Sequence, residues 1–79
     1  MIKKDIVIGL GEIGLPILNL LSKKIKVDGF DKIEKRNTNN FSNIKNVEFM
    51  HVCIPFSKNF EKSVSQLTKK FNPDGIVIH

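Results

Sequence analysis

Three glycines near the start of the chain have the spacing of a phosphate-binding turn. Residues 4–14 read Lys-Asp-Ile-Val-Ile-Gly-Leu-Gly-Glu-Ile-Gly, so an apolar, β-branched run leads directly into Gly-x-Gly-x-x-Gly. Gly9 allows a tight turn after a strand, Gly11 lets the backbone approach a diphosphate without a Cβ in the way, and Gly14 lets the following helix pack closely on the strand. The unpaired N–H groups and the dipole at the start of that helix then face the diphosphate. The pattern predicts a site for a dinucleotide.

A carboxylate at the end of the second strand is the other residue that such a site uses, because it accepts hydrogen bonds from ribose hydroxyls. Asp31 lies 22 residues after Gly9, at the end of the segment 26–31. Asp28 is the competing acid, but it falls in the middle of that segment. The spacing favours Asp31 as the ribose ligand. Its alternative role is that of a turn-forming or capping residue before Lys32.

The same carboxylate bears on the choice of cofactor. A negative charge beside the ribose repels a 2′-phosphate, so Asp31 favours NAD over NADP. Lys32, Lys35 and Arg36 follow closely, and a cation in this loop could accept the phosphate of NADP instead. The predicted cofactor is therefore NAD, with NADP as the less favoured alternative.

Two further segments complete the predicted contacts with the cofactor. Glu12 and Ile13 lie at the mouth of the glycine turn, where the Glu12 carboxylate is expected to act as a charge at the helix N-terminus rather than as a base. Pro55 ends the apolar run 47–55, which should pass close to the cofactor. Ser57 either contacts a ligand or, like Asn59, caps the next helix. The predicted cofactor-binding residues are Gly9, Gly11, Glu12, Ile13, Gly14, Asp31 and Pro55.

Neither a catalytic set nor a metal site is expected. The only cysteine, Cys53, falls inside an apolar run without a neighbouring His-Asp pair, so it is interpreted as a buried structural thiol. His51 and His79 have no metal-ligand spacing with a cysteine or a carboxylate, and His51 is expected in or beside the sheet. The sequence also lacks Gly-x-x-x-x-Gly-Lys-Ser/Thr, which excludes phosphoryl transfer of the P-loop type.

Two helices are expected to position these residues. Lys23 and Lys24 close the first helix, which has Pro16 in its first turn, and Lys69 and Lys70 fall at the end of the second. Each helix has an apolar stripe at helical spacing. The first stripe consists of Ile13, Ile17, Leu18, Leu20, Leu21 and Ile25, widened by Leu15, and the second of Phe60, Val64, Leu67 and Phe71.

Four short strands are expected around these helices. Residues 6–8, 47–55 and 76–78 are apolar runs typical of strands covered on both faces, and 26–31 reads as a short second strand. Residues 32–46 are rich in asparagine and are expected to hold a turn or two. The order β-α-β-loop-β-α-β predicts a Rossmann-like three-layer α/β fold. Its short parallel sheet has the order 2-1-3-4 and is truncated relative to a full dinucleotide-binding domain.

The composition sets the broad class of the protein. The chain has 79 residues, a net charge of +5, 41% hydrophobic and 27% charged residues, which is ordinary for one small soluble domain. The lysines are dispersed as pairs without aromatic interleaving, so no nucleic-acid partner is expected. Without a long apolar stretch or a possible internal disulfide, the chain is expected to be cytoplasmic and to have no membrane partner. The apolar last strand could pair two copies into a homo-oligomer.

Four segments resemble one family of dehydrogenases when they are taken together. Residues 9–16 read Gly-Leu-Gly-Glu-Ile-Gly-Leu-Pro, 27–31 read Val-Asp-Gly-Phe-Asp, 52–55 read Val-Cys-Ile-Pro and 76–79 read Ile-Val-Ile-His. They resemble, in order, the glycine motif that continues into Leu-Pro, the second strand with its ribose-binding Asp, the strand that ends in a proline beside the cofactor, and the next strand. The family is that of the UDP-glucose/GDP-mannose (nucleotide-sugar) dehydrogenases. The resemblance leaves out residues 32–46, a segment that is much longer in the full enzymes.

The resemblance implies the NAD-binding N-terminal portion of an oxidoreductase that uses NAD as hydride acceptor at a sugar-nucleotide carbon. In this family the catalytic cysteine and lysine lie far beyond the cofactor domain, so Cys53 is not assigned that role and no catalytic residue is expected here. Residues 1–79 are then one domain of a larger protein, inactive alone. Two alternatives stay open: a non-catalytic dinucleotide-binding or regulatory module, and the cofactor domain of a 6-phosphogluconate or β-hydroxyacid dehydrogenase relative.

Overall fold

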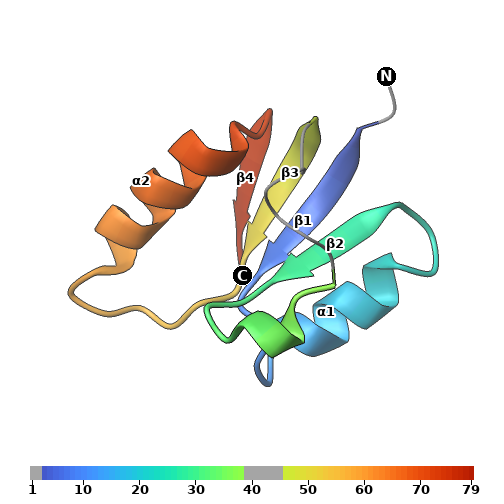
Figure 1. The fold of residues 1–79 in the computed structure, drawn as a ribbon, viewed down its shortest axis with the longest axis horizontal. Helices are drawn as coiled ribbons and strands as arrows, with labels where there is room; N and C mark the ends of the chain where they lie inside the picture. Colours follow the sequence, from blue (N-terminus) through green and yellow to red (C-terminus); the bar gives the residue numbers. More distant parts are fainter. Residues whose placement is uncertain (1–2, 39–45) are drawn as a thin grey trace.

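A computed structural model describes residues 3–38 and 46–79, which form one parallel sheet with helices packed on it (Figure 1). The strands lie in the order β2-β1-β3-β4, and every neighbouring pair is parallel. This confirms the α/β fold class and the strand order that the sequence predicts. The elements are β1 (Lys4–Ile8), α1 (Gly14–Leu21), β2 (Val27–Phe30), a 3₁₀ turn η1 (Glu34–Arg36), β3 (Val47–Val52), α2 (Phe60–Phe71) and β4 (Gly75–Ile78).

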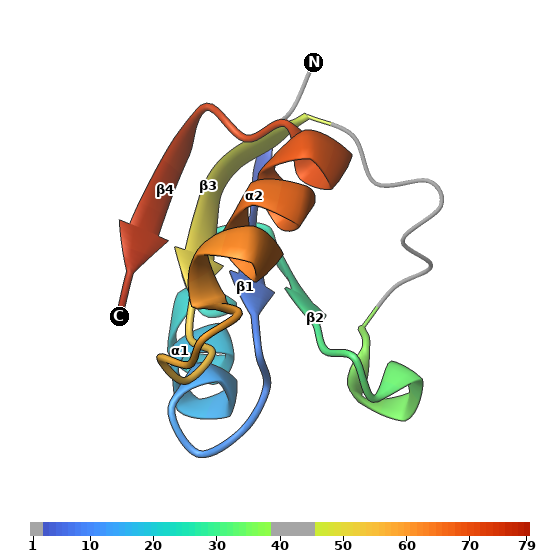
Figure 2. The ribbon, with the colours of Figure 1, turned by 90° about the vertical axis from the view of Figure 1, so that its left-hand side faces the viewer.

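Helix α2 covers one face of the sheet (Figure 2). Its four predicted stripe residues all pack against the strand side chains of this face, because the spacing i, i+4, i+7 and i+11 keeps them on one side of a helix. Lys69 and Lys70 lie in its last turn, and Asn72 ends it with a left-handed φ of 45°. The buried core of this face consists of Ile6, Ile8, Val47, Met50, Val52 and Phe71.

Helix α1 packs on the opposite face and buries less than predicted. Leu18 is 7% exposed and belongs to a smaller core with Val7 and Leu10. The wide stripe is wrong: α1 ends at Leu21 after about two turns, and four of the predicted residues are exposed. Lys23 and Lys24 therefore lie beyond the last turn of α1, which contains no basic residue. These four residues of the predicted stripe, which are between 43% and 64% exposed, are Ile13, Leu15, Leu20 and Ile25.

Strands β2 and β3 are shorter than predicted. β2 ends at Phe30, one residue before Asp31, and β3 ends at Val52, three residues before Pro55. The pairing of β3 with β1 also shifts near its start, which is a β-bulge. Because the bulge inserts an extra residue, Phe49 is 42% exposed instead of buried as the strand pattern predicts. Of the turn or two expected within residues 32–46, one is present as η1, and residues 39–45 lie outside the described residues.

Candidate functional site

The segments that follow β1 and β3 leave the carboxyl edge of the sheet toward opposite faces. The chain after β1 passes to α1, and the chain after β3 passes to α2 (Figure 2). In the order β2-β1-β3-β4, the chain runs outward from β1 to β2 on one side and from β3 to β4 on the other, so the strand order reverses between β1 and β3. Open α/β sheets bind ligands outside the carboxyl ends of the strands at such a switch point. The glycine turn and the loop after β3 are therefore the two sides of the candidate site.

Two glycines of the turn are required by the fold. Gly9 has a φ of 87°, which side-chain-bearing residues rarely adopt, and a Cβ there would lie 3.0 Å from Cγ2 of Ile54. A Cβ on Gly14 would lie 1.6 Å from the carbonyl oxygen of Gly9 and 3.2 Å from Cβ of Cys53. Both findings confirm the predicted roles in the tight turn and in the close packing of α1.

Gly11 is different, because neither the backbone conformation nor the packing requires glycine there. Gly9 is the glycine with positive φ, and a Cβ on Gly11 would meet no atom within 4 Å beyond its chain neighbours. The space outside Gly11 is therefore open, directly before the start of α1. Within the described residues, no acceptor is found for the N–H groups of Glu12 and Ile13, and Ile13 caps α1 without a side-chain hydrogen bond.

Glu12 and Ile13 are both exposed at the mouth of the turn, as predicted from their position. Glu12 lies one residue before the N-cap Ile13 and outside the first turn of α1, so its expected role as a charge at the helix N-terminus stays a prediction. The N–H groups of Glu12 and Ile13, just before α1, are free of acceptors among the described residues, whereas the Leu15 N–H donates to the carbonyl oxygen of Gly11, and the first turn of α1 contains no acid.

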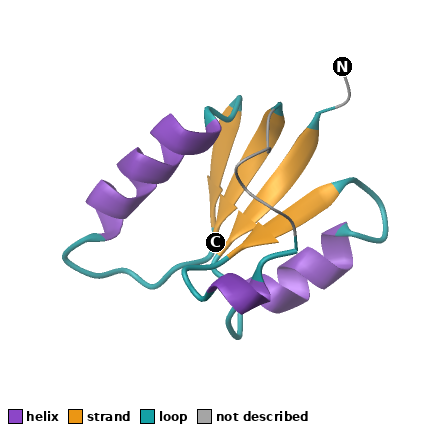
Figure 3. Cartoon of the chain, in the orientation of Figure 1, coloured by secondary structure: helices purple, strands orange, loops and turns teal. Residues whose placement is uncertain are grey.

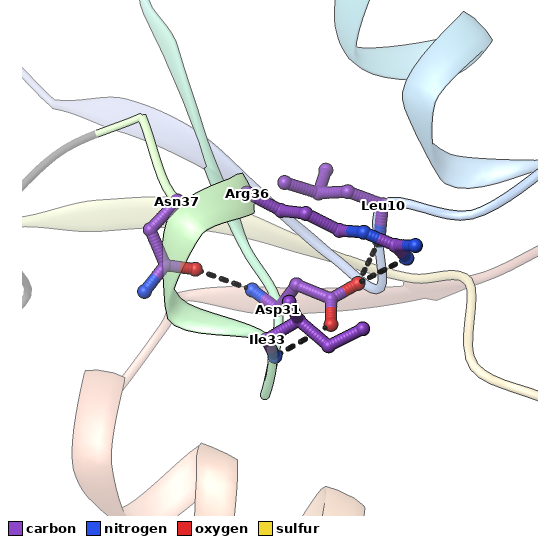
Figure 4. A network of polar contacts seen from close by, with 5 residues as sticks. All are labelled: Leu10, Asp31, Ile33, Arg36 and Asn37. Carbon is purple, nitrogen blue, oxygen red and sulfur yellow. Dashed lines mark hydrogen bonds and ion pairs between the residues drawn. The ribbon is translucent and has the colours of Figure 1, made fainter.

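Asp31 connects the end of β2 to the glycine turn (Figure 4). The Leu10 N–H donates to its Oδ2 at 2.8 Å, and the Ile33 N–H donates to its Oδ1 at 2.9 Å. The backbone N–H of Asp31 donates to Oδ1 of Asn37 at 2.7 Å, and a guanidinium nitrogen of Arg36 lies 3.7 Å from Oδ2. The fold thus brings Asp31 beside the glycine turn and also gives it the turn-forming role that the sequence left open.

The environment of Asp31 keeps its carboxyl ionised. Burial acts to raise the pKa, because it disfavours the charged form. The N–H groups of Ile33 and Leu10 and the positive charges of Arg36 and Lys32 act in the opposite direction, and together they hold the pKa of Asp31 below its ordinary value. Each carboxylate oxygen can accept more than one hydrogen bond, so Asp31 retains acceptor capacity for a hydroxyl group.

The competing acid, Asp28, lies at a different end of the sheet. Its Oδ2 is 2.7 Å from Nζ of Lys4, and its Oδ1 accepts a hydrogen bond from the Thr38 hydroxyl at 3.2 Å. An open hollow of about 410 Å³ at this amino end contains none of the predicted site residues. The hollow is lined by Lys4, Ser22, Ile25, Lys26, Val27 and Asp28.

The loop after β3 forms the other side of the candidate site. Cys53 is half-buried against the glycine turn, and burial raises the pKa of its thiol, as expected for a structural cysteine. Pro55 and Ser57 are exposed in the loop, so a ligand can reach both. Asn59 is the N-cap residue of α2, as predicted, but its side chain makes no cap hydrogen bond, and it is the backbone oxygen of Ser57 that accepts the Phe60 N–H.

A row of three hydrogen-bonded side chains was not predicted from the sequence. Nε2 of His51 lies 2.7 Å from Oδ2 of Asp5, and Nδ1 of His51 lies 2.9 Å from Nε2 of His79. Asp5 is 7% and His51 9% exposed, and His51 lies within β3 as expected. Alternation along the strands assigns each residue to a face, but only the strand register brings the three together. Residues 3–38 and 46–79 contain no group of three or more potential ligands that could hold a metal ion.

Comparisons with known proteins give no match. No protein-family model, no curated protein and no solved structure matches this chain. Among the described helices, none is long and apolar enough to cross a membrane.

Proposed function

We propose that this chain binds NAD at the carboxyl edge of its sheet, as the cofactor-binding part of an NAD-dependent dehydrogenase of the nucleotide-sugar type. The observation that carries the proposal is the open space outside Gly11. Gly9 and Gly14 are needed by the fold, whereas at Gly11 a side chain would fit without a clash or a strained backbone. A glycine in this position serves the close approach of a diphosphate to the backbone.

Three parts of the chain would hold the three parts of the cofactor. The free N–H groups at residues 11–13 and the dipole of α1 attract the diphosphate. The ionised carboxylate of Asp31 accepts hydrogen bonds from the hydroxyls of one ribose. The loop 53–57, which is exposed from Pro55 to Ser57, would border the other half of the cofactor. NAD supplies the ring that accepts a hydride, and the residues of this chain bind and orient it.

Asp31 also supports NAD over NADP. A carboxylate that stays ionised repels the additional phosphate of NADP, and the nearest cation, Arg36, already lies 3.7 Å from that carboxylate. Arg36 is therefore paired with Asp31 in the free protein. NADP would have to displace this contact in order to use the cation.

A calorimetric titration of NAD into the wild type, Gly11→Ala and Gly11→Val tests the proposal. Because the new side chain enters open space, both variants should keep the unfolding midpoint of the wild type. The affinity for NAD should fall in the order wild type, alanine, valine, with a loss of about tenfold or more for valine, or about 1.4 kcal/mol. Ser65→Ala, on the exposed side of α2, is the matched control. An unchanged affinity in Gly11→Val would contradict the proposal.

A further inference from the structure

The row formed by Asp5, His51 and His79 lies on the face of the sheet where α1 packs. His51 of β3 pairs with Val7 of β1 and with Val77 of β4, so these three residues lie on one face of the sheet. Asp5 is two residues before Val7 and His79 two residues after Val77, so both lie on this face as well. α1 packs chiefly on β1 and β2, so it leaves His79 exposed beyond the end of β4. The row therefore runs from a buried carboxylate to an imidazole that solvent or a ligand can reach.

The two imidazoles of the row meet nitrogen to nitrogen. The two imidazole centroids are 5.2 Å apart with the rings 27° from parallel, while the facing nitrogens are 2.9 Å apart. The difference between these distances corresponds to two ring radii, so the nitrogens point at one another along the line between the rings. Such an arrangement fits an N–H···N hydrogen bond and not two rings bound to one metal ion.

The carboxylate at the buried end fixes the direction of the hydrogen bonds. Oδ1 of Asp5 accepts the N–H of Phe49 at 3.3 Å, and its Oδ2 faces Nε2 of His51. A carboxylate oxygen accepts a hydrogen bond, which puts the proton of His51 on Nε2. Nδ1 of a neutral His51 must then accept from Nε2–H of His79. The remaining nitrogen, Nδ1 of His79, has a free lone pair and no partner among residues 3–38 and 46–79.

His79 lies at the same edge of the sheet as the candidate site. Its backbone N–H donates to the carbonyl oxygen of Val52 at 3.0 Å, which continues the β3–β4 pairing by one residue beside Cys53. The chain end in Figure 3 accordingly lies at the carboxyl ends of the strands. If Asp31 after β2 holds one ribose and the turn after β1 holds the diphosphate, the other half of an extended dinucleotide lies over β3 and β4. His79 is two strands from β1, about 10 Å at the usual interstrand spacing.

We infer that His79 is a general base placed beside the nicotinamide half of the bound dinucleotide, an inference that rests on the proposed function. Its substrate class is an alcohol. Nδ1 of His79 would take the hydroxyl proton, and bound NAD would supply the acceptor for the hydride from the alcohol carbon, so that the alcohol would become a carbonyl. His51 and Asp5 are positioning residues that hold His79 in the tautomer with a basic Nδ1. A general base of this kind typically contributes a factor of about 10² to 10⁴ to the rate.

The tautomers are tested by long-range ¹H–¹⁵N NMR on the imidazoles of the full chain. We expect the Nε2–H tautomer for both His51 and His79 at neutral pH. In His51→Met, which removes the acceptor, His79 should become a mixture of tautomers. A predominant Nδ1–H tautomer of His79 in the wild type would overturn the inference, and this result does not depend on whether the variant folds.

The position of His79 is tested by comparing NAD with ADP-ribose, which lacks the nicotinamide. Both ligands should shift the Gly11 amide resonance, but only NAD should shift the ring resonances of His79. If both ligands shift Gly11 and NAD leaves His79 unchanged, the role of His79 is wrong and dinucleotide binding stands. If neither ligand shifts Gly11, the proposed function fails and the role of His79 fails with it.

Discussion

Asp31 combines a structural role with the proposed ligand role. Its two carboxylate oxygens accept backbone N–H groups from Leu10 and Ile33, so the same side chain that would bind a ribose also holds the glycine turn against the end of β2. Hydrogen bonds to a charged group contribute about 1.5–3 kcal/mol each. The geometry of the turn therefore depends on an acid that a sequence motif would assign to the ligand alone.

Asp31 should make the stability of the chain depend on pH in the acid range. Its pKa is lowered in the folded state, so its contribution is complete above the ordinary aspartate value of about 3.9 and is lost as the pH falls through the lower folded value. Urea unfolding at pH 7 and pH 3 should show a smaller loss of unfolding free energy for Asp31→Asn than for the wild type. Equal losses in the two proteins would contradict the hydrogen-bond network.

The charge of Asp31 should also set the preference between cofactors. In Asp31→Ser the repulsion of the 2′-phosphate disappears and Arg36, which lies 3.7 Å from the carboxylate in the wild type, becomes available. Calorimetry should then show a rise in NADP affinity relative to NAD. Arg36→Ala in the same background should reverse that rise. If neither substitution changed the ratio of NADP affinity to NAD affinity, the ribose would not bind at Asp31.

The two helices differ in how well their sequences predict them. In α2, the stripe from Phe60 to Phe71 runs for three turns and ends at a turn signal, so its buried side follows directly from the spacing. In α1, apolar residues continue past Leu21, but the helix stops there and Leu20 stays 64% exposed. Spacing alone cannot reveal which apolar residues the neighbouring strands will cover, because that depends on the tertiary packing.

Because the two helices are buried to different extents, replacing one of their apolar side chains by alanine should lower the unfolding free energy by different amounts. Phe71 is 5% exposed in the core under α2, so Phe71→Ala should cost about 3–5 kcal/mol, enough to unfold most of a chain this small. Leu20→Ala on α1 should change the unfolding free energy by less than about 0.5 kcal/mol. Circular dichroism during urea unfolding measures both. Similar costs would show that α1 buries more of its surface than the structure indicates.

The candidate site was predictable where local rules determine it. Gly9 and Gly14 follow from the turn and the helix contact, and Asp31 follows from its place at the end of a strand. The row of Asp5, His51 and His79 was not predictable, because its residues are far apart in the sequence and meet only through the parallel pairing of three strands. The bulge in β3, whose Phe49 N–H donates to Asp5, also has no signature in the sequence.

At the scale of the whole molecule, β4 is an edge of the sheet within the part of the chain that the structure describes. Ile76 and Ile78 on this strand are 42% and 49% exposed. Apolar edge strands pair readily with other strands, so we expect sedimentation velocity to show self-association of the purified chain at high concentration. Ile78→Lys should remove it without loss of helical signal. A wild type that stays monomeric throughout would exclude this edge as a contact between copies.

The central claim is that the carboxyl edge of the sheet binds NAD. Thermal unfolding of the wild-type chain with increasing NAD, NADH, NADP and FAD tests it most directly. A ligand that binds only the folded state adds about 2.7 kcal/mol to its stability at a hundredfold excess over the dissociation constant. The unfolding midpoint should rise with NAD and NADH, rise less with NADP and stay unchanged with FAD. A folded chain whose midpoint responds to none of the four would contradict it.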